Sequence, residues 1–424
     1  MTSLKIPYGS ELIDLNIEGK LLDPTERRSK VIQNNADAVI RHALQNPVGG
    51  TPGLHEIVKN KEQANIVIVI DDQTRNAPTA KMLDCLTEEL TGDNLDITLL
   101  VACGTHAAPT EADLKRMLGK HCTRFDIKSH DCDAKDMVYL GTTTRGTPVM
   151  LNRIYVEADI KVLTGDITLH YYAGFGGGRK SILPGIASRE TIQRNHALLV
   201  DDRARTANID GNPVHLDMSE AASMAPPDIV LNTVEDASGN LIEAYAGELN
   251  AVFNNGIELA RDMFCIETTG SFDALVVSAG GFPKDRNLYQ ALKAVENSYR
   301  ALAPGGKFIL IAECLDGLGD TEFEVWMNTY TSYDAVEEAI KSNFVLGGHK
   351  AYYLRKAMQR VKLSIVCKRN HNTLTRWGIT SYESVAEAIK GEIGAGKKEG
   401  EQAAIKGKLK IGILRNGLDT LIMN

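Results

Sequence analysis

A glycine-rich stretch at residues 173–188, AGFGGGRKSILPGIAS, sets two cations directly after three consecutive glycines. It misses the phosphate-binding pattern GxxxxGK[ST] at one position, because Arg179 stands where the second glycine should be. A phosphate loop also leads into a helix whose N-terminus faces the phosphates. Here Pro184 and Gly185 follow Lys180 within about one turn, and a proline inside a helix costs about 3 kcal/mol. The stretch therefore predicts a loop whose backbone binds a ligand of unspecified kind.

Two of the ten histidines stand where a general acid or base would be useful. His106 and His170 each follow an apolar run by a few residues and lie in small, polar segments. Imidazole titrates near neutral pH, so either ring could move a proton in catalysis, and either could equally be structural. His196, in ETIQRNHALLV, is typical of a helix residue, and one helical histidine is weak evidence for a metal.

Charged side chains follow the apolar run NIVIVI, in the segment DDQTRNAP. Arg75 could pair with Asp71 or Asp72 within a turn, or it could hold a substrate carboxylate through two hydrogen bonds. The two aspartates are residues that commonly form turns. Lys293, close to Gln290 in FPKDRNLYQALK, is expected on a helix, where a lysine is usually solvated. At this level both interpretations of Arg75 stay open.

Short apolar, β-branched runs alternate with amphipathic segments along the chain. The runs lack polar–apolar alternation, which indicates strands buried on both faces and hence a mostly parallel sheet. Helical patterns between them predict an α/β fold, for example at 25–45, 249–264, 287–302 and 382–398. The expected strands are 65–71, 96–104, 158–166, 228–234, 273–281, 307–314, 362–368 and 408–414.

The chain is long enough for two domains, and the polar stretch IETTGSFD separates a helical pattern from a new strand. We expect one domain over 1–268 and another over 269–424, each a mostly parallel sheet flanked by helices. Ligands of open α/β sheets bind beyond the carboxyl ends of the strands, where the polar segments described above begin. The predicted active site is therefore the cleft between the two domains.

The composition is that of a soluble globular protein, with 43% hydrophobic and 24% charged residues. A net charge of −8 without a dense Lys/Arg cluster disfavours nucleic acid and anionic membranes as partners. The first residues lack the pattern of a secretory signal, and no apolar run approaches the ~18 residues of a membrane span. Seven scattered cysteines without a CxxC pair indicate reduced thiols, as in a cytoplasm.

Taken together, these segments resemble the nickel-dependent lactate racemase family, from IPYG near the N-terminus to the final GLDTLI. The most specific element is HYYAGFGGGRKSILPGIASRETIQRNH, supported in the expected order by DDQTRNAP, ACGTH and GGFPKDRNLYQALK. The resemblance implies an isomerase, a racemase or epimerase that inverts C2 of a 2-hydroxy acid. It also implies nickel held by a pyridinium-3-thioamide-5-thiocarboxylic acid mononucleotide, a pincer cofactor made by separate maturation enzymes.

The resemblance assigns a role to each of eight polar residues. The N-terminal domain would anchor the cofactor and carry the catalysis, and the C-terminal domain would contribute substrate-binding residues. Hydride would pass from C2 to the cofactor while one histidine takes the hydroxyl proton, and the planar 2-keto acid could receive hydride on either face. The implied roles are acid/base catalysis for His106 and His170, cofactor attachment for Lys180, nickel ligation for His196, support of the cofactor site for Asp72, and substrate binding for Arg75, Lys293 and Gln290.

Differences from lactate-specific members concern the substrate. Gly176 stands where those members have the serine of GFSGGRKS. The segment 346–359 has no tryptophan where lactate racemase has one near the substrate, and His349 falls closest in an ungapped comparison. Lys284 and Arg286 add positive charge near the expected rim. We therefore expect a 2-hydroxy acid that is larger or more polar than lactate.

Two other functions stay open. A nucleotide-dependent kinase or hydrolase would use the glycine loop, and its ATP binding would respond to Arg179→Gly more than to His196→Ala. A non-catalytic carrier of the nickel cofactor would need Lys180 and His196 but neither His106 nor His170.

Overall fold

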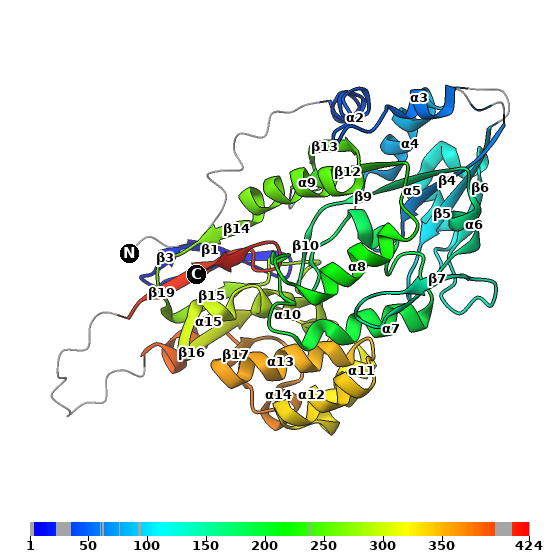
Figure 1. Ribbon diagram of the computed structural model, residues 1–424. Coiled ribbons are helices and arrows are strands. Elements are labelled where there is room, and N and C mark those ends of the chain that lie inside the picture. Colours follow the sequence, from blue (N-terminus) through cyan, green and yellow to red (C-terminus); the bar gives the residue numbers. More distant parts are fainter. Residues whose placement is uncertain are drawn as a thin grey trace, which may run out of the picture. The chain divides into compact units, whose positions relative to one another are not determined.

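The computed structural model describes residues 4–22, 35–59, 61, 63–75, 77–91, 95–236, 239–394 and 409–423 (Figure 1). The chain forms two compact units, a larger unit of residues 28–263 and a smaller unit that joins residues 1–27 to 264–424. Each unit contains a six-stranded sheet in which all or nearly all pairs are parallel. The predicted α/β class is therefore confirmed.

The larger unit is built on a sheet with the order β13-β12-β9-β4-β5-β6. Neighbours pair in parallel except β13, which runs antiparallel to β12. Residues 67–70 of the central strand are completely or almost completely buried, because helices and loops cover parallel sheets on both faces. The strands are β4 (Ala64–Asp71), β5 (Leu95–Ala102), β6 (Asp126–Ser129), β9 (Ile160–Asp166), β12 (Ile229–Glu235) and β13 (Leu241–Gly247).

Helical residues between positions 36 and 118 pack apolar side chains against this sheet to form one core. Of the helix expected over 25–45, the part Ala36–Gln45 is helical, and residues 25–34 lie outside the described residues. The helices are α2 (Ala36–Gln45), α3 (Leu54–Lys59), α4 (Thr79–Glu89), α5 (Glu111–Leu118), α6 (Arg153–Glu157), α7 (Arg189–Ala197), α8 (Pro213–Ser223) and α9 (Leu249–Phe264), with 3₁₀ turns η1 (Gly119–Thr123), η2 (Gly178–Ser181) and η3 (Leu198–Val200). Two hairpins complete the unit: β7 (Val138–Thr142) with β8 (Pro148–Leu151), and β10 (Leu169–His170) with β11 (Gly174–Phe175).

The smaller unit has an entirely parallel sheet with the order β18-β17-β16-β15-β19-β3. Its strands are β3 (Lys20–Leu21), β15 (Phe272–Ser278), β16 (Leu302–Ile311), β17 (Lys362–Val366), β18 (Thr380–Tyr382) and β19 (Ile411–Leu414), and β14 (Cys265–Glu267) pairs with β20 (Leu421–Met423). Its helices are α10 (Leu288–Glu296), α11 (Thr321–Thr329), α12 (Tyr333–Ser342), α13 (Gly348–Arg360), α14 (His371–Arg376) and α15 (Val385–Glu392), with the turn η4 (Tyr299–Ala301). All eight expected strands are present, four in each sheet.

The N-terminal residues lie with the smaller unit. The hairpin of β1 (Leu4–Tyr8) and β2 (Glu11–Leu15) contributes Ile6 to the same apolar core as Val276 and Ile309. β3 adds an edge strand to β19. The expected division into 1–268 and 269–424 did not include this return of the N-terminus to the second sheet.

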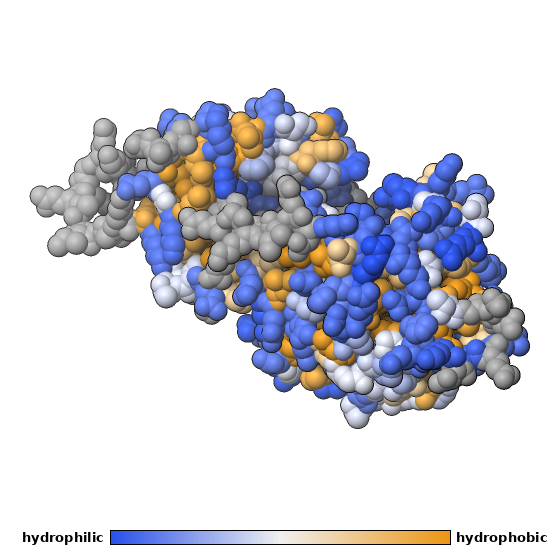
Figure 2. All heavy atoms as spheres, turned by 90° about the horizontal axis from the view of Figure 1, so that it is seen from above, coloured by the Kyte–Doolittle hydropathy of each residue, from blue (hydrophilic) through white to orange (hydrophobic). Residues whose placement is uncertain are grey.

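Hydrophilic side chains cover much of the face drawn in Figure 2, with hydrophobic ones interspersed. No described helix is long and apolar enough to span a membrane. The seven cysteines form no disulfide, and six of them are buried.

Candidate active site

Polar residues of the larger unit gather at the carboxyl ends of neighbouring strands. Asp71 ends β4, Asp166 ends β9, and His106 follows β5. A hydrogen bond of 2.9 Å from Gly104 N to Gly185 O joins the loop after β5 to the segment that follows the glycine loop. The parallel sheet thus brings together segments that are about 80 or more residues apart in the chain, as ligand sites of open α/β sheets require.

Arg179 is buried beneath the glycine loop and stabilises it through hydrogen bonds to the loop backbone. Its side chain is 2% exposed and donates hydrogen bonds to the carbonyl oxygens of Ala173, Phe175 and Gly177 at 2.9, 3.1 and 3.2 Å. The guanidinium also lies 4.1 Å from the ring centroid of Phe253. Burial lowers the pKa of Arg179 to about 9, so the group is still cationic near neutral pH. Arg179 is therefore a structural cation of the loop.

The loop does not have the geometry of a phosphate loop. In the fully described segment 173–200, Lys180 lies in a four-residue 3₁₀ turn, and the next α-helix begins only at Arg189. Gly177 has φ +75°, and a Cβ there would stand 2.7 Å from Ile167 Cγ1 and 2.9 Å from the carbonyl oxygen of Asp166. The glycines therefore allow close packing against the end of β9.

We expect Arg179→Met to destabilise the protein by at least about 3 kcal/mol, because three carbonyl groups lose a buried charged donor. Urea unfolding measures the effect. Arg189→Met is the matched control, since Arg189 is 46% exposed in its ion pair with Asp133 and should contribute little. Equal losses in the two variants would contradict the structural role of Arg179.

Three of the predicted site residues surround the ring of Tyr172. The imidazoles of His170 and His196 meet it edge-on, with centroid separations of 4.5 and 5.0 Å, and Lys180 Nζ lies 5.9 Å from its centroid. Tyr172 is 5% exposed. Tyr172 was not among the residues predicted from the sequence, although it lies between the histidine and the glycines of the most specific motif.

His106 forms a pair with Asp72. Its Nδ1 lies 2.6 Å from Asp72 Oδ2, and the other carboxylate oxygen accepts from the backbone N–H and hydroxyl of Thr74 at 2.9 and 2.6 Å. Burial would raise the pKa of Asp72, but the hydrogen bonds from His106 and Thr74 lower it overall. The ionised carboxylate therefore fixes the orientation of the His106 ring.

Lys180 and Arg75 share one electrostatic environment. Burial, followed by the positive charges of Arg75 and Arg179, lowers the pKa of Lys180 well below its ordinary value, while Asp71 acts in the opposite direction. Desolvation would lower the pKa of Arg75, but the carboxylates of Asp166, Asp71 and Asp72 raise it overall. The uncharged form of the Lys180 amine is thus favoured relative to an ordinary lysine, whereas Arg75 stays a cation.

Carboxyl groups of β4, β9 and β12 form an acidic cluster that the sequence analysis did not identify as a unit. Burial, then the charge of Asp166, raises the pKa of Asp71 and that of Glu235. Asp166 pairs in register with Thr233, two residues before Glu235. Asp71, Asp166 and Glu235 are thus brought together by the order of the strands, which cannot be read from their spacing in the chain.

We expect Glu235→Gln to flatten the pH dependence of folding stability. The pKa of Glu235 rises from 4.5 to about 8 in the folded protein, so the native state binds more protons than the unfolded state across this window. Its contribution to the unfolding free energy therefore falls as pH rises, by up to about 1.4 kcal/mol per pH unit. Unfolding in urea between about pH 5.5 and 7.5 measures the slope.

The matched control is Glu88→Gln. Glu88 is an exposed partner of Arg41, whose hydrogen bond lowers its pKa, so its titration lies below this pH window. The effect of that substitution should not vary between about pH 5.5 and 7.5. A pH slope unchanged by Glu235→Gln would contradict the raised pKa.

Lys293 and Gln290 lie in the smaller unit, on α10. Asn287 caps this helix by accepting from Gln290 N at 3.0 Å, which begins the helix just before the two residues. The Gln290 side chain is exposed and that of Lys293 is half-buried. Their participation in a site with the residues of the larger unit, in a cleft between domains, stays a prediction.

The charges expected at the rim are neutralised. Lys284 forms an ion pair with Asp419, and Arg286 donates to Asp316 from Nε at 2.7 Å. The expectation that they add net positive charge is therefore wrong, because each has a carboxylate partner distant in the chain. His349 is 1% exposed and accepts from Gly347 N at 3.2 Å, and burial lowers its pKa to about 3. Its ring is thus neutral and packed.

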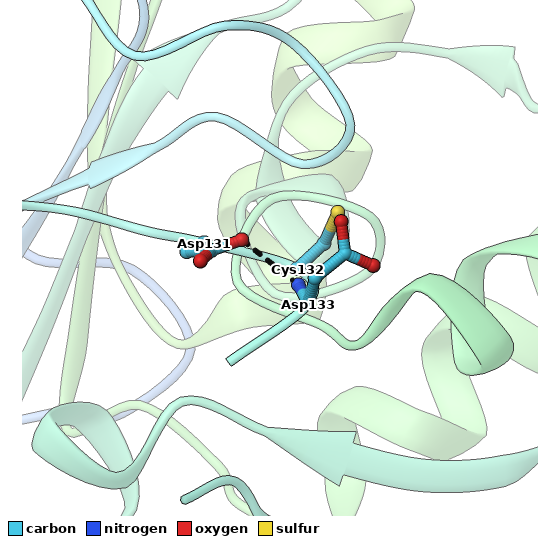
Figure 3. A group of neighbouring side chains, drawn as sticks. All are labelled: Asp131, Cys132 and Asp133. Carbon is cyan, nitrogen blue, oxygen red and sulfur yellow. Dashed lines mark hydrogen bonds between the residues drawn. The ribbon is translucent and has the colours of Figure 1, made fainter. Parts of the chain in front are cut away.

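One group of neighbouring potential metal ligands occurs in the described residues, Asp131, Cys132 and Asp133 (Figure 3). Asp133 already binds the Arg189 guanidinium through two hydrogen bonds of 2.6 Å, and Asp131 accepts from Asp133 N within a turn. A cation would have to displace Arg189. The cluster is explained as a turn and a surface ion pair.

A parallel α/β sheet that presents a His–Asp pair, a second histidine and a lysine of lowered pKa at one edge has the groups of an enzyme that transfers protons. Comparison with known proteins identifies which enzyme class this is. Sequence models match residues 8–207 as the lactate racemase N-terminal domain and residues 268–413 as the lactate racemase C-terminal domain. The chain belongs to the lactate racemase family. It is therefore a racemase, an isomerase.

Individual relatives agree with this assignment. Lactate racemase from Thermoanaerobacterium thermosaccharolyticum is 34% identical over 337 residues, 77% of this chain and 78% of the relative. Lactate racemase from Lactiplantibacillus plantarum is 31% identical over 76% of this chain and 77% of its own length. The solved lactate racemase apoprotein from T. thermosaccharolyticum matches all of both chains with a TM-score of 0.88 and 28% identity. A protein from Thermotoga maritima, at 17% identity and a TM-score of 0.62, covers 91% of this chain and 98% of its own and shares the fold.

Proposed function

We propose that this racemase inverts C2 of a 2-hydroxy acid by proton-coupled hydride transfer. It would use a nickel-bearing pyridinium-3-thioamide-5-thiocarboxylic acid mononucleotide attached to Lys180, with His196 as the protein ligand of nickel. The observation that supports this most directly is the arrangement of His170, His196 and Lys180 around the ring of Tyr172. An attachment point, a metal ligand and an acid/base residue are the three groups that such a reaction must hold together.

The residues present fit the chemistry of that cofactor. An uncharged Lys180 amine can form an amide-type bond, which a protonated amine cannot, and the pKa shift of Lys180 favours the uncharged form. The cofactor supplies two sulfur ligands for nickel and a hydride acceptor when it is bound. One imidazole is then enough from the protein. Cys103, the cysteine near Asp72, has its pKa raised to about 11 by burial, so it is a thiol and a poor ligand.

Proton movement is the task of the two histidines. Asp72 accepts from His106 Nδ1 and so directs Nε2 to the substrate hydroxyl, as the carboxylate of a catalytic triad does for its histidine. His170, whose ring lies against Tyr172, would serve the opposite face of the substrate. Inversion requires proton transfer on both faces, so one histidine alone would not complete the cycle.

Arg75, Lys293 and Gln290 are proposed to bind the substrate. Arg75 remains cationic among three aspartates and suits a carboxylate ligand. The named relatives act on lactate. We propose that this chain acts on a larger or more polar 2-hydroxy acid. The proposal now rests on the absence of a tryptophan in segment 346–359, because Lys284 and Arg286 are paired with carboxylates. At Gly176, a Cβ would stand 3.0 Å from Thr168 Oγ1, so a serine there would require a small shift of the Thr168 side chain.

The alternatives account for less of the site. A kinase or hydrolase would need a phosphate-binding helix after the loop, and Arg179 would have to leave its three carbonyl partners. A cofactor carrier gives no reason for the His106–Asp72 pair. We propose that maturation enzymes are the protein partners and that the enzyme works in the cytoplasm, where seven cysteines that form no disulfide would stay reduced.

The experiment begins with protein made alongside the maturation enzymes and checked by intact mass. A panel of C2-deuterated 2-hydroxy acids, lactate among them, is then tested for racemisation. Retention of deuterium at C2 of the inverted product supports hydride return. Its loss to solvent would indicate simple proton abstraction and overturn the proposed mechanism, and lactate as by far the best substrate would overturn the expectation of a larger acid.

A further inference from the structure

The two proposed acid/base histidines differ in what their Nδ1 atoms contact. Nδ1 of His106 faces a carboxylate oxygen of Asp72. An ionised carboxylate can only accept a hydrogen bond. Nδ1 of His170 faces the backbone N–H of Ala173 at 3.2 Å, which can only donate. A neutral imidazole carries one proton, so these two contacts demand different positions for it.

For His106, the proton belongs on Nδ1. Asp72 is ionised because its pKa is lowered, and its other oxygen is already engaged by Thr74. In the neutral ring Nε2 then bears a lone pair. His106 is therefore set to accept a proton at Nε2.

For His170, the proton belongs on Nε2. The backbone N–H of Ala173 donates a hydrogen bond to the lone pair of His170 Nδ1. The carbonyl oxygen of Ala173 accepts a hydrogen bond from Arg179, which holds this part of the backbone in place. Tyr171 stacks on the imidazole at 5.0 Å with an interplanar angle of 6°, and Tyr172 meets it edge-on at 4.5 Å. These contacts hold both the backbone amide and the ring plane in place. His170 is therefore set to donate from Nε2.

We propose that Asp72 and the Ala173 amide hold His106 and His170 in opposite tautomers, so that the resting enzyme has one base and one hydrogen-bond donor. Asp72 and Ala173 are positioning residues in this scheme. Its catalytic meaning rests on the function proposed above. The substrate hydroxyl is deprotonated directly only by His106, whose Nε2 gains the proton, while His170 first holds the substrate oxygen by donating a hydrogen bond. For His170 to act as a base at Nε2, its proton must leave Nε2 and the Ala173 hydrogen bond must be given up.

The test is the pattern of imidazole ¹⁵N chemical shifts in full-length protein labelled with ¹⁵N-histidine, because protonated and unprotonated ring nitrogens differ widely. Spectra are recorded at about pH 8.5, above the usual histidine range near 6.5. His130 is an internal reference for the Nε2–H tautomer: it is buried, donates from Nε2 to Ala187 O at 2.9 Å, and its Nδ1 lies 3.2 Å from the Asn152 amide. Histidine-to-glutamine variants assign the signals of His106, His130 and His170, and of His121, which serves as a control.

His170 should show the pattern of His130, and His106 the opposite one. Asp72→Asn should shift the His106 signals alone, since an amide no longer selects one tautomer. Asp84→Asn is the matched control, because Asp84 Oδ1 lies 2.8 Å from His121 Nε2 in a second carboxylate–histidine pair. That variant should shift His121 and leave both proposed catalytic rings unchanged.

The same tautomer in His106 and His170 would overturn the proposal, as would His106 signals that do not respond to Asp72→Asn. These outcomes are separate from those of the deuterium experiment. Racemisation with retained label would stand even if the two tautomers proved identical, and opposite tautomers would stand even if the label were lost.

Discussion

Lys180→Arg protein made alongside the maturation enzymes is expected to carry no added cofactor mass and to have no measurable racemase activity. Arginine keeps a long, nitrogen-bearing side chain at this position, but a guanidinium stays protonated and cannot form the attachment bond. The proposed attachment at Lys180 would place the cofactor near Tyr172, whose ring contacts both His170 and His196. Orientation of this kind contributes rate factors of about 10⁵ or more, so activity should fall by at least that amount.

Intact mass spectrometry and turnover assays together measure this effect. Lys128→Arg is the control, because Lys128 is 51% exposed on β6 and pairs with Asp126. It should load and turn over like the parent protein. Full activity of Lys180→Arg, or added mass retained in it, would place the attachment elsewhere.

A His106→Asn variant of the loaded enzyme should lose kcat/KM by about 10²- to 10⁴-fold, the usual contribution of a general acid or base. The loss should be equal for the two enantiomers, even though His106 would face only one side of the substrate. Substrate and product have a fixed equilibrium, so no substitution can change the ratio of the forward and reverse kcat/KM values. Only the separate kcat and KM values can diverge.

Polarimetry in both directions tests this result. His55→Asn is the control, since His55 is exposed and contacts Thr91 at 3.1 Å, outside the proposed site. A His106 variant that differs from this control by less than about 2-fold would remove His106 from the proton-transfer steps.

Much of the architecture follows from local sequence properties. Unbroken apolar runs predicted eight of the twelve strands in the two six-stranded sheets, because strands covered on both faces have no polar alternation. The positions of His106 and Lys180 after such strands predicted that they lie at one edge of a sheet. The pairing of β3 with β19 was not predictable in this way, since a two-residue edge strand leaves no periodic signal.

Side-chain partners were the part that the sequence could not provide. Arg179 was assigned no role from the sequence, because its partners are carbonyl groups of its own loop and backbone direction is not encoded in residue type. Lys284 looked unpaired because Asp419 is 135 residues away. Tyr172 was not predicted, because an aromatic residue beside glycines is ordinarily interpreted as a core residue rather than as part of a site.

The hydrogen bonds from Arg179 to three loop carbonyls have a consequence for how the enzyme is assembled. A segment whose shape is set by its own guanidinium does not have to fold around an incoming molecule. Under the proposed attachment at Lys180, the unmodified polypeptide would already present this amine on a preformed loop, and little configurational entropy would be lost when the cofactor is attached. An enzyme that attached the cofactor would therefore act on a loop that is already folded.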